Sequence, residues 1–130
     1  MKNDVVTVRY QVANIERAAN FYREQLGFQP TERYGTAFGA VTRGKLRLIL
    51  SGPGSSGSRP MPDGQQQAPG GWNRIIVYVD DLSSTIASLE KGGVRFRNQV
   101  EAGPGGKQIL LEDPDGNLIE LHEAPAEPAK

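Results

Sequence analysis

Residues 108–123 read QILLEDPDGNLIELHE, two alternating stretches joined by one strongly typed turn, DPDGN at 113–117. Pro114 presets φ for the first turn position, and Gly116 can adopt the positive φ that closes such a loop. Side chains alternate along a strand, so the second strand has two distinct faces: Leu118, Glu120 and His122 on one, Ile119 and Leu121 on the other. The stretch therefore predicts a β-hairpin with one apolar face and one face that holds a carboxylate and the only histidine of the chain.

The same pattern occurs earlier in the chain. Residues 44–50 (GKLRLIL) align with 116–122 (GNLIELH) at a constant shift, 116 − 44 = 72. Residues 12–15 (VANI) align with 79–82 (VDDL), where 79 − 12 = 67. Two copies of one supersecondary unit are therefore predicted.

The first copy shows signals for one helix between strands. Residues 5–12 alternate as a half-buried strand. Asn14 is a favourable N-cap, apolar residues then recur at helical spacing, and Gly27 suits the helix end. Three extended runs follow: one from Phe28, one over 37–42 and one over 45–50.

The second copy repeats this order. Residues 74–79 (RIIVYV) predict a strand, and Asp80 or Asp81 caps a helix over 82–91 that the glycines at 92–93 end. A strand over 94–98, a glycine-rich turn over 103–106 and the opening hairpin complete the unit. Each copy therefore reads β-α-β-β-β.

Residues 51–72 change composition to glycine, proline, serine and glutamine. A mobile linker between unit 1 (5–50) and unit 2 (73–123) is one interpretation, and a lid over a binding site is the other. Met61 and Trp72 are the large side chains with which a lid would close. The predicted organisation is one domain over 1–130, with a frayed tail at 124–130.

The composition restricts the classes of function. Fifteen basic and fifteen acidic residues cancel and are scattered, which argues against nucleic acid and membrane-surface partners. There is no cysteine, the N-terminus lacks a signal-peptide core, and no stretch approaches the roughly 20 apolar residues of a membrane span. We expect a cytoplasmic protein that binds a small molecule.

Two such units predict an α+β fold, in which two mixed sheets side by side leave a half-open cup with the helices on the outer face. If the helices cover the faces of Val6 and Ile75, the opposite faces line the cup. The predicted lining is Thr7, Arg9, Gln11, Leu48, Leu50, Arg74, Ile76, Tyr78, Leu118, Glu120 and His122.

Three motifs resemble the vicinal oxygen chelate superfamily, which includes glyoxalase I, extradiol dioxygenases, fosfomycin-resistance enzymes and bleomycin-binding proteins. They are IERAANFY with LGF at 15–28, VDDL at 79–82 and EDPDGN with IEL at 112–121. The resemblance spans residues 5–123. It implies the cup fold, a homodimer and a small-molecule ligand, but no single activity.

Metalloenzymes of that superfamily carry ligands at cup-facing positions of the first and last strands of each unit. The resemblance places these positions at Thr7 and Leu48 in the first copy and at Arg74 and Glu120 in the second. The shifts of 67 and 72 residues between the copies agree with this placement. Only Glu120 has a ligand-type side chain, and a guanidinium at Arg74 repels a divalent cation. We therefore expect no cofactor, with a divalent ion such as Zn, Ni, Mn or Fe bound through Glu120 as the alternative.

An ion pair between Arg74 and Glu120 is the predicted replacement for a metal. Glu120 is also a candidate general base, and His122 a candidate acid or base that competes with a surface role. The predicted ligand-binding residues are Thr7, Arg9, Leu48, Arg74, Tyr78 and Trp72. The two arginines suit an anionic group, and the two aromatic residues suit an aromatic ligand or rim packing.

The leading functional hypothesis is a small-molecule-binding protein, similar to glyoxalases and bleomycin-resistance proteins, with a degenerate metal site. One alternative is a glyoxalase-like lyase or isomerase, or a dioxygenase, with a divalent metal. Another is a resistance protein that sequesters a drug. Sequence alone leaves open whether the protein is an enzyme.

Overall fold

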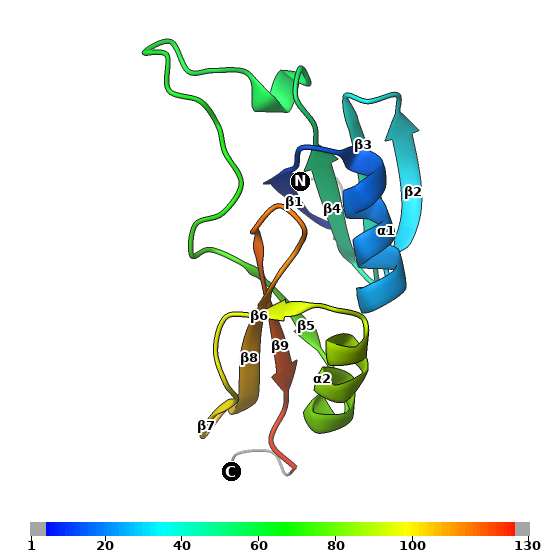
Figure 1. The fold of residues 1–130 in the computed structure, drawn as a ribbon, viewed down its shortest axis with the longest axis vertical. Coiled ribbons are helices and arrows are strands. Elements are labelled where there is room, and N and C mark those ends of the chain that lie inside the picture. The colour runs from blue at the N-terminus through cyan, green and yellow to red at the C-terminus, as the bar shows by residue number, and fades with distance from the viewer. Residues whose placement is uncertain (1–4, 127–130) are drawn as a thin grey trace. The chain divides into compact units, whose positions relative to one another are not determined.

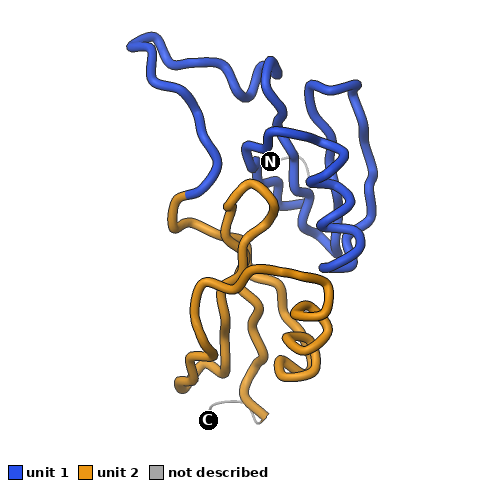
Figure 2. The backbone as a smooth tube through the Cα atoms, viewed as in Figure 1, with its two compact units in different colours: residues 1–70 blue, residues 71–130 orange. Residues whose placement is uncertain are grey.

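The structure is a computed structural model and describes residues 5–126. The chain divides into two compact units, Met1–Gly70 and Gly71–Lys130 (Figure 2). Each unit has one α-helix and a mixed sheet (Figure 1), so the predicted α+β class is confirmed. No helix within residues 5–126 is long and apolar enough to cross a membrane. The cup between the sheets stays a prediction, and part of the predicted tail, 127–130, lies outside the described residues.

Unit 1 contains a four-stranded sheet with the order β1-β4-β3-β2. β1 runs parallel to β4, and the other neighbours are antiparallel. The elements of this unit are β1 (Val6–Gln11), α1 (Ile15–Leu26), β2 (Gln29–Tyr34), β3 (Phe38–Arg43) and β4 (Leu46–Ser51). Their order matches the predicted β-α-β-β-β.

Local signals determine the ends of α1. The Asn14 side chain accepts a hydrogen bond from the backbone N–H of Arg17 at 2.9 Å, and Gly27 ends the helix at φ 72°. The helix buries its apolar face, which consists of Ile15, Ala18, Tyr22 and Leu26. Gly39 in β3 lies against this face, because a Cβ there would come within 3.0 Å of Ile15. The helix therefore covers one face of the sheet.

The pairing of β1 with β4 corrects the predicted face of Leu48. Val8 lies opposite Leu48 and Tyr10 opposite Leu50, and residues paired in this way point to the same side of a sheet. Leu50 also pairs with Gly39, on the side that α1 covers. Leu48 and Leu50 are therefore core residues beneath α1, with no exposed surface, and do not share the face of Thr7.

The shift between the two copies explains this error. Arg9 pairs with Ile49, and Ile76 pairs with Glu120. Since 76 − 9 = 67 and 120 − 49 = 71, the structural counterpart of Glu120 is Ile49. Matching the turn glycines Gly44 and Gly116 had given a shift of 72, and a one-residue slip moves every side chain to the other face.

Unit 2 contains a sheet with the order β5-β9-β8-β6, and β7 also pairs with β8. Its elements are β5 (Ile75–Tyr78), α2 (Leu82–Lys91), β6 (Arg95–Phe96), β7 (Glu101–Gly103), β8 (Gly106–Glu112) and β9 (Leu118–Glu123). The predicted cap of α2 is confirmed at Asp81, which accepts from the backbone N–H of Ser84 at 3.1 Å. The unit thus has one strand more than predicted.

The strand predicted over 94–98 is only two residues long in the structure, where it is β6. The backbone N–H of Arg97 donates to Leu110, but the next ladder position is taken by a side chain, because Asn98 Oδ1 accepts from the Leu110 N–H at 2.9 Å. The chain then leaves β6 and returns as β7. A side-chain amide that replaces a backbone partner therefore divides the predicted strand in two.

The turn between β8 and β9 is organised by a buried carboxylate. Asp113 is 1% exposed and accepts from the backbone N–H groups of Asp115 at 2.8 Å and Asn117 at 2.9 Å. Gly116 adopts φ 88°, as the sequence predicts. Asp113 therefore has the structural turn role expected of it.

Residues 52–70 make side-chain contacts with β1 of the same unit. Gln11 Nε2 donates to the Gly57 carbonyl at 2.9 Å and to Gln67 Oε1 at 3.2 Å, and Gln11 Oε1 accepts from Ser58 Oγ at 2.6 Å. A short 3-10 helix, η1 (Ser56–Ser58), lies in this segment. Gln11 thus connects the loop to β1.

Candidate functional site

Glu120 lies in the middle of β9 and is 4% exposed. Its Oε1 accepts hydrogen bonds from Arg74 Nε at 3.1 Å and Arg74 Nη2 at 2.9 Å. The ion pair predicted between these residues is thus present. A carboxylate at this depth needs such a partner, because burying an unpaired charge costs several kcal/mol.

His122 extends this pair into a chain of three side chains. Its Nδ1 lies 3.1 Å from Glu120 Oε2, and its Nε2 lies 2.8 Å from the Gly105 carbonyl oxygen. Both partners are acceptors, so the doubly protonated imidazolium satisfies both contacts. The hydrogen bond to Gly105, and then that to Glu120, raises the pKa of His122.

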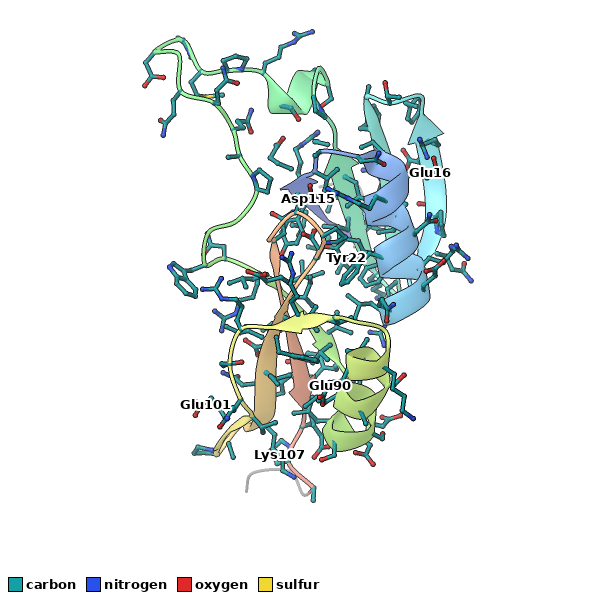
Figure 3. All side chains as sticks on the ribbon, in the orientation of Figure 1. Glu16, Tyr22, Glu90, Glu101, Lys107 and Asp115 are labelled. Atoms are coloured by element: carbon teal, nitrogen blue, oxygen red, sulfur yellow. The ribbon has the colours of Figure 1, made fainter. Side chains whose placement is uncertain are left out.

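The surface role considered for His122 does not match its surroundings. Only 17% of the side chain is exposed, and Gly105 belongs to the turn between β7 and β8. His122 and Glu101 both line a hollow of about 180 Å³. Glu101 lies at the same end of the sheet as Lys107 (Figure 3). His122 therefore joins β9 to the neighbouring hairpin.

Apolar and aromatic side chains lie on the same face of β5 as Arg74. Alternation places Ile76 and Tyr78 there, and they are 45% and 62% exposed. The rings of Tyr78 and His122 are 5.3 Å apart and tilted. We call the residues of this surface, namely Arg74, Ile76, Tyr78, Glu120 and His122, the Glu120 face.

Trp72 lies just before β5 and is 67% exposed. Arg97 Cζ is 5.2 Å from the centre of its ring. This cation–π contact is absent from the sequence predictions, because it joins residues whose separation carries no periodic signal.

The unit 1 candidates do not form one cluster. Thr7 is exposed on the face opposite α1, and Arg9 lies on the same side, where its Nη1 donates to Ser51 Oγ at 2.7 Å. A Cβ on Gly57 would overlap the Arg9 guanidinium, so the loop covers that group closely. Leu48 points away from both. The ligand-binding roles of Thr7 and Arg9 stay predictions.

An ion pair that the sequence did not indicate lies on the Arg9 side of unit 1. Arg47 Nε donates to Glu32 Oε1 at 3.0 Å, and Arg47 Nη2 donates to Glu32 Oε2 at 2.8 Å. The hydrogen bonds from Arg47 lower the pKa of the Glu32 carboxyl, and those to Glu32 raise the pKa of Arg47. Arg47 and Ser51, two residues before and two residues after Ile49, are both polar. This alternation was the signal in the sequence that Ile49, and not Leu48, lies on the face of Thr7 and Arg9.

The donor set does not fit a divalent metal ion. Within residues 5–126, no group of three or more His, Cys, Asp or Glu side chains is placed to hold one. With the observed register, the four positions at which related metalloenzymes carry ligands are Thr7, Ile49, Arg74 and Glu120. The first three have no side chain of a type that binds metal. Glu120 is the exception, and both of its oxygens already contact neighbours. Catalytic metal sites commonly use three protein ligands.

Comparison with known proteins gives a consistent family. Residues 4–121 match the model of the Glyoxalase/Bleomycin resistance protein/Dioxygenase superfamily. Mitochondrial methylmalonyl-CoA epimerase from Mus musculus is 29% identical over 126 residues, which cover 90% of this chain and 71% of that protein. A probable chloroplastic lactoylglutathione lyase from Arabidopsis thaliana is 30% identical over 135 residues, with 95% of this chain but only 37% of that protein covered.

Solved structures show the same fold. A superfamily member from Sphaerobacter thermophilus has a TM-score of 0.74 at 28% identity, covering 92% of this chain and 95% of its own. An antibiotic binding protein from Streptomyces sp. CB03234 has a TM-score of 0.72 at 26% identity, covering 95% of this chain and 97% of its own. The similar proteins thus include both named enzymes and a named binding protein.

Proposed function

Since the chain belongs to the Glyoxalase/Bleomycin resistance protein/Dioxygenase superfamily, we propose that it binds a small organic molecule on the Glu120 face without a divalent metal ion. The observation that carries this proposal is the engagement of both Glu120 oxygens. Oε1 accepts from Arg74 and Oε2 contacts His122, so the carboxylate is already neutralised. A metal ion would have to displace these partners.

The surroundings of Glu120 suit a ligand with an apolar body. Ile76 and Tyr78 expose apolar and aromatic surface on the same face, close to the ion pair. Small-molecule sites typically combine such surface with a few polar groups that fix orientation. With His122 as an imidazolium, Arg74 and His122 also outweigh the single carboxylate. An uncharged or anionic ligand therefore fits better than a cation.

Thermal unfolding of protein freed of metal with EDTA tests this proposal. After the EDTA has been removed, we expect aromatic carboxylates such as 3-phenylpropionate to raise the unfolding midpoint, and added Zn, Ni, Mn or Fe(II) to leave it unchanged. The matched variant is Glu120→Gln, which removes the carboxylate that competes for Arg74 and should keep or strengthen the effect of an anionic ligand. Stoichiometric metal in untreated protein, together with a metal-dependent midpoint rise that Glu120→Gln abolishes, would contradict the proposal.

A lyase or isomerase is the second candidate function. The contact between Glu120 Oε2 and His122 Nδ1 favours it, since a carboxylate beside an imidazole can move a proton. Two relatives are also named as a lyase and an epimerase. The test is formation of lactoylglutathione from its hemithioacetal precursor, and epimerisation of methylmalonyl-CoA. Turnover retained by Glu120→Gln would eliminate Glu120 as the base.

Sequestration of a drug is supported by the similarity to an antibiotic binding protein. The excess of cationic groups around Glu120 argues against a large cationic guest. Calorimetric titration with bleomycin separates this function from the others. Stoichiometric binding would favour sequestration, and absence of binding would remove it.

A further inference from the structure

We propose that Trp72, Arg74 and Arg97 form a subsite for the anionic group, carboxylate or phosphate, of a ligand with an aromatic or apolar body. This subsite rests on the proposed function, because it defines one end of the molecule bound on the Glu120 face. All three residues belong to unit 2. We call them the Trp72 subsite.

Two guanidinium groups converge on Trp72. Arg97 Cζ is 5.2 Å from the centre of the indole ring, and Arg74 Nη1 donates to the Trp72 backbone carbonyl at 3.4 Å. Arg74 and Arg97 therefore reach the same residue, one through its ring and one through its backbone. In the subsite, the anionic end of a ligand lies against Trp72 and within reach of these two guanidinium groups.

The exposure of Trp72 is unusual for so large an aromatic side chain. Two thirds of it, 67%, is open to solvent although Arg97 lies over the ring. Exposed apolar surface of this size next to polar groups is typical of binding sites. Exposed Ile76 and Tyr78 continue the apolar surface along β5 beyond Arg74. The body of a ligand can therefore lie over these side chains with its charged end at the arginines.

Arg97 shares its carboxylate partner with a second arginine. Arg74 pairs with Glu120, whereas Arg95 and Arg97 share Glu112, at 3.6 and 3.2 Å. Glu112 is thus divided between two guanidinium groups, and Arg95 also donates to the Asp113 backbone carbonyl at 3.3 Å. An anion at Arg97 would therefore add to a carboxylate that Arg97 shares with a second guanidinium.

Hydrogen-bond donors are also available at Arg74. A guanidinium has five N–H groups, and Arg74 donates through Nε and Nη2 to Glu120 and through Nη1 to Trp72. Its side chain is 28% exposed, and that of Arg97 is 42% exposed. The planar fork of arginine matches the geometry of carboxylate and phosphate oxygens. Each arginine can thus keep its internal carboxylate and still contact an anion.

Trp72 is the only tryptophan of the chain, so its indole N–H gives one unambiguous NMR signal. The experiment titrates ¹⁵N-labelled protein with benzoate and phenyl phosphate, with neutral benzamide and cationic benzylamine as controls. We expect a saturable shift of the indole signal with the two anions, and binding of the neutral and cationic compounds at least about tenfold weaker, as for loss of a hydrogen bond to a charged group.

Variants test the role of Arg97. Arg97→Gln should weaken benzoate binding about tenfold or more, and Arg97→Lys, which keeps the charge but loses the planar fork, should weaken it less. Arg23→Gln is the matched control, because Arg23 is an exposed arginine paired with Glu24 in unit 1. It should bind benzoate as the unchanged protein does. Arg97→Lys also guards against a folding defect in Arg97→Gln.

The outcomes separate the Trp72 subsite from the proposed function. If benzoate raises the unfolding midpoint but neither shifts the indole signal nor depends on Arg97, the subsite is wrong and binding on the Glu120 face stands. Equal affinity for benzoate and benzamide also overturns the subsite. If the midpoint and the indole signal respond to none of the compounds, both proposals fail.

Discussion

Arg74 and Glu120 form a two-donor ion pair in which Nε and Nη2 of the guanidinium, at 3.1 and 2.9 Å, both donate to Oε1 of a carboxylate that is only 4% exposed. The pair joins the start of β5 to the middle of β9. Removing one member leaves the other charge without its main partner, and the strength of this coupling is measurable.

Arg74→Ala is expected to lower the free energy of unfolding by about 2 kcal/mol, less than for a fully buried pair because Arg74 is 28% exposed. Urea unfolding followed by circular dichroism measures the loss. Arg23→Ala, in an exposed pair with Glu24, should cost less than about 0.5 kcal/mol. Equal costs for the two variants would show that the buried pair adds no stability.

The hydrogen bonds of His122 predict a dependence of stability on pH. Gly105, and next Glu120, raise its folded pKa above the unfolded value of about 6.5. The stabilisation is therefore fully present below about pH 6.5 and is lost as pH rises through the folded pKa.

As the only histidine, His122 can be titrated by proton NMR without assignment. The stability difference between the unchanged protein and His122→Gln should shrink as pH rises from 6 to 9. A measured pKa at or below about 6.5 would contradict the double hydrogen bond.

Leu48 and Thr7 separate the two faces of the unit 1 sheet. Leu48 has no exposed surface on the α1 side, so Leu48→Ala should cost about 3 kcal/mol through the cavity it leaves. Thr7→Ala, at an exposed position on the opposite face, should change stability by less than about 0.5 kcal/mol. Chemical unfolding of both variants is the measurement. A small loss for Leu48→Ala would restore its predicted place on the ligand side.

Elements with local signals were predictable from the sequence. Asn14 and Asp81 cap the two helices as predicted, and Gly27 and Gly116 adopt the positive φ expected of them. These signals depend on a few adjacent residues, so sequence is sufficient for them. The Arg74–Glu120 pair was also predictable, because β5 and β9 belong to one repeat unit whose alternation is clear.

The pairing between strands was harder to predict from the sequence. In β4 the polar residues Arg47 and Ser51 indicate one face, but Ile49 between them is apolar, and the alignment on the turn glycines placed Leu48 on that face; the register with β1 corrects this. The length of β6 depends on the hydrogen bond that the Asn98 side chain accepts from the Leu110 N–H. The contact of Trp72 with Arg97 depends on tertiary packing. The length of β6 and the contact of Trp72 with Arg97 have no signature in neighbouring residues.

Gln11→Ala is expected to release the 52–70 loop without unfolding unit 1. The Gln11 amide bonds to Gly57, Ser58 and Gln67, so its loss should raise hydrogen exchange of the loop amides severalfold. Gln29→Ala, at an exposed position of β2, is the control and should leave the loop unchanged. Equal exchange in both variants would mean that Gln11 does not hold the loop, and would favour the mobile-linker interpretation.

Asp113 offers the sharpest test of the turn between β8 and β9. Its carboxylate is 1% exposed and accepts from the backbone N–H groups of Asp115 and Asn117 and from Asn117 Nδ2 at 3.0 Å. Asp113→Ala leaves these donors without that acceptor, and we expect a loss of about 2–3 kcal/mol in urea unfolding. Asp113→Asn keeps one amide oxygen as acceptor and should lose less.

The control for Asp113 is Asp63→Ala, because Asp63 makes the same kind of turn bond, to the Gln65 N–H at 3.0 Å, but in an exposed loop. The two sites differ in burial and in the number of donors, so Asp63→Ala should cost less than about 0.5 kcal/mol. A loss at Asp113 no larger than at Asp63 would show that the DPDGN turn is held by its backbone conformation alone. Because β9 begins directly after this turn and carries Glu120 and His122, a large loss at Asp113 would connect the stability of the turn to the candidate site.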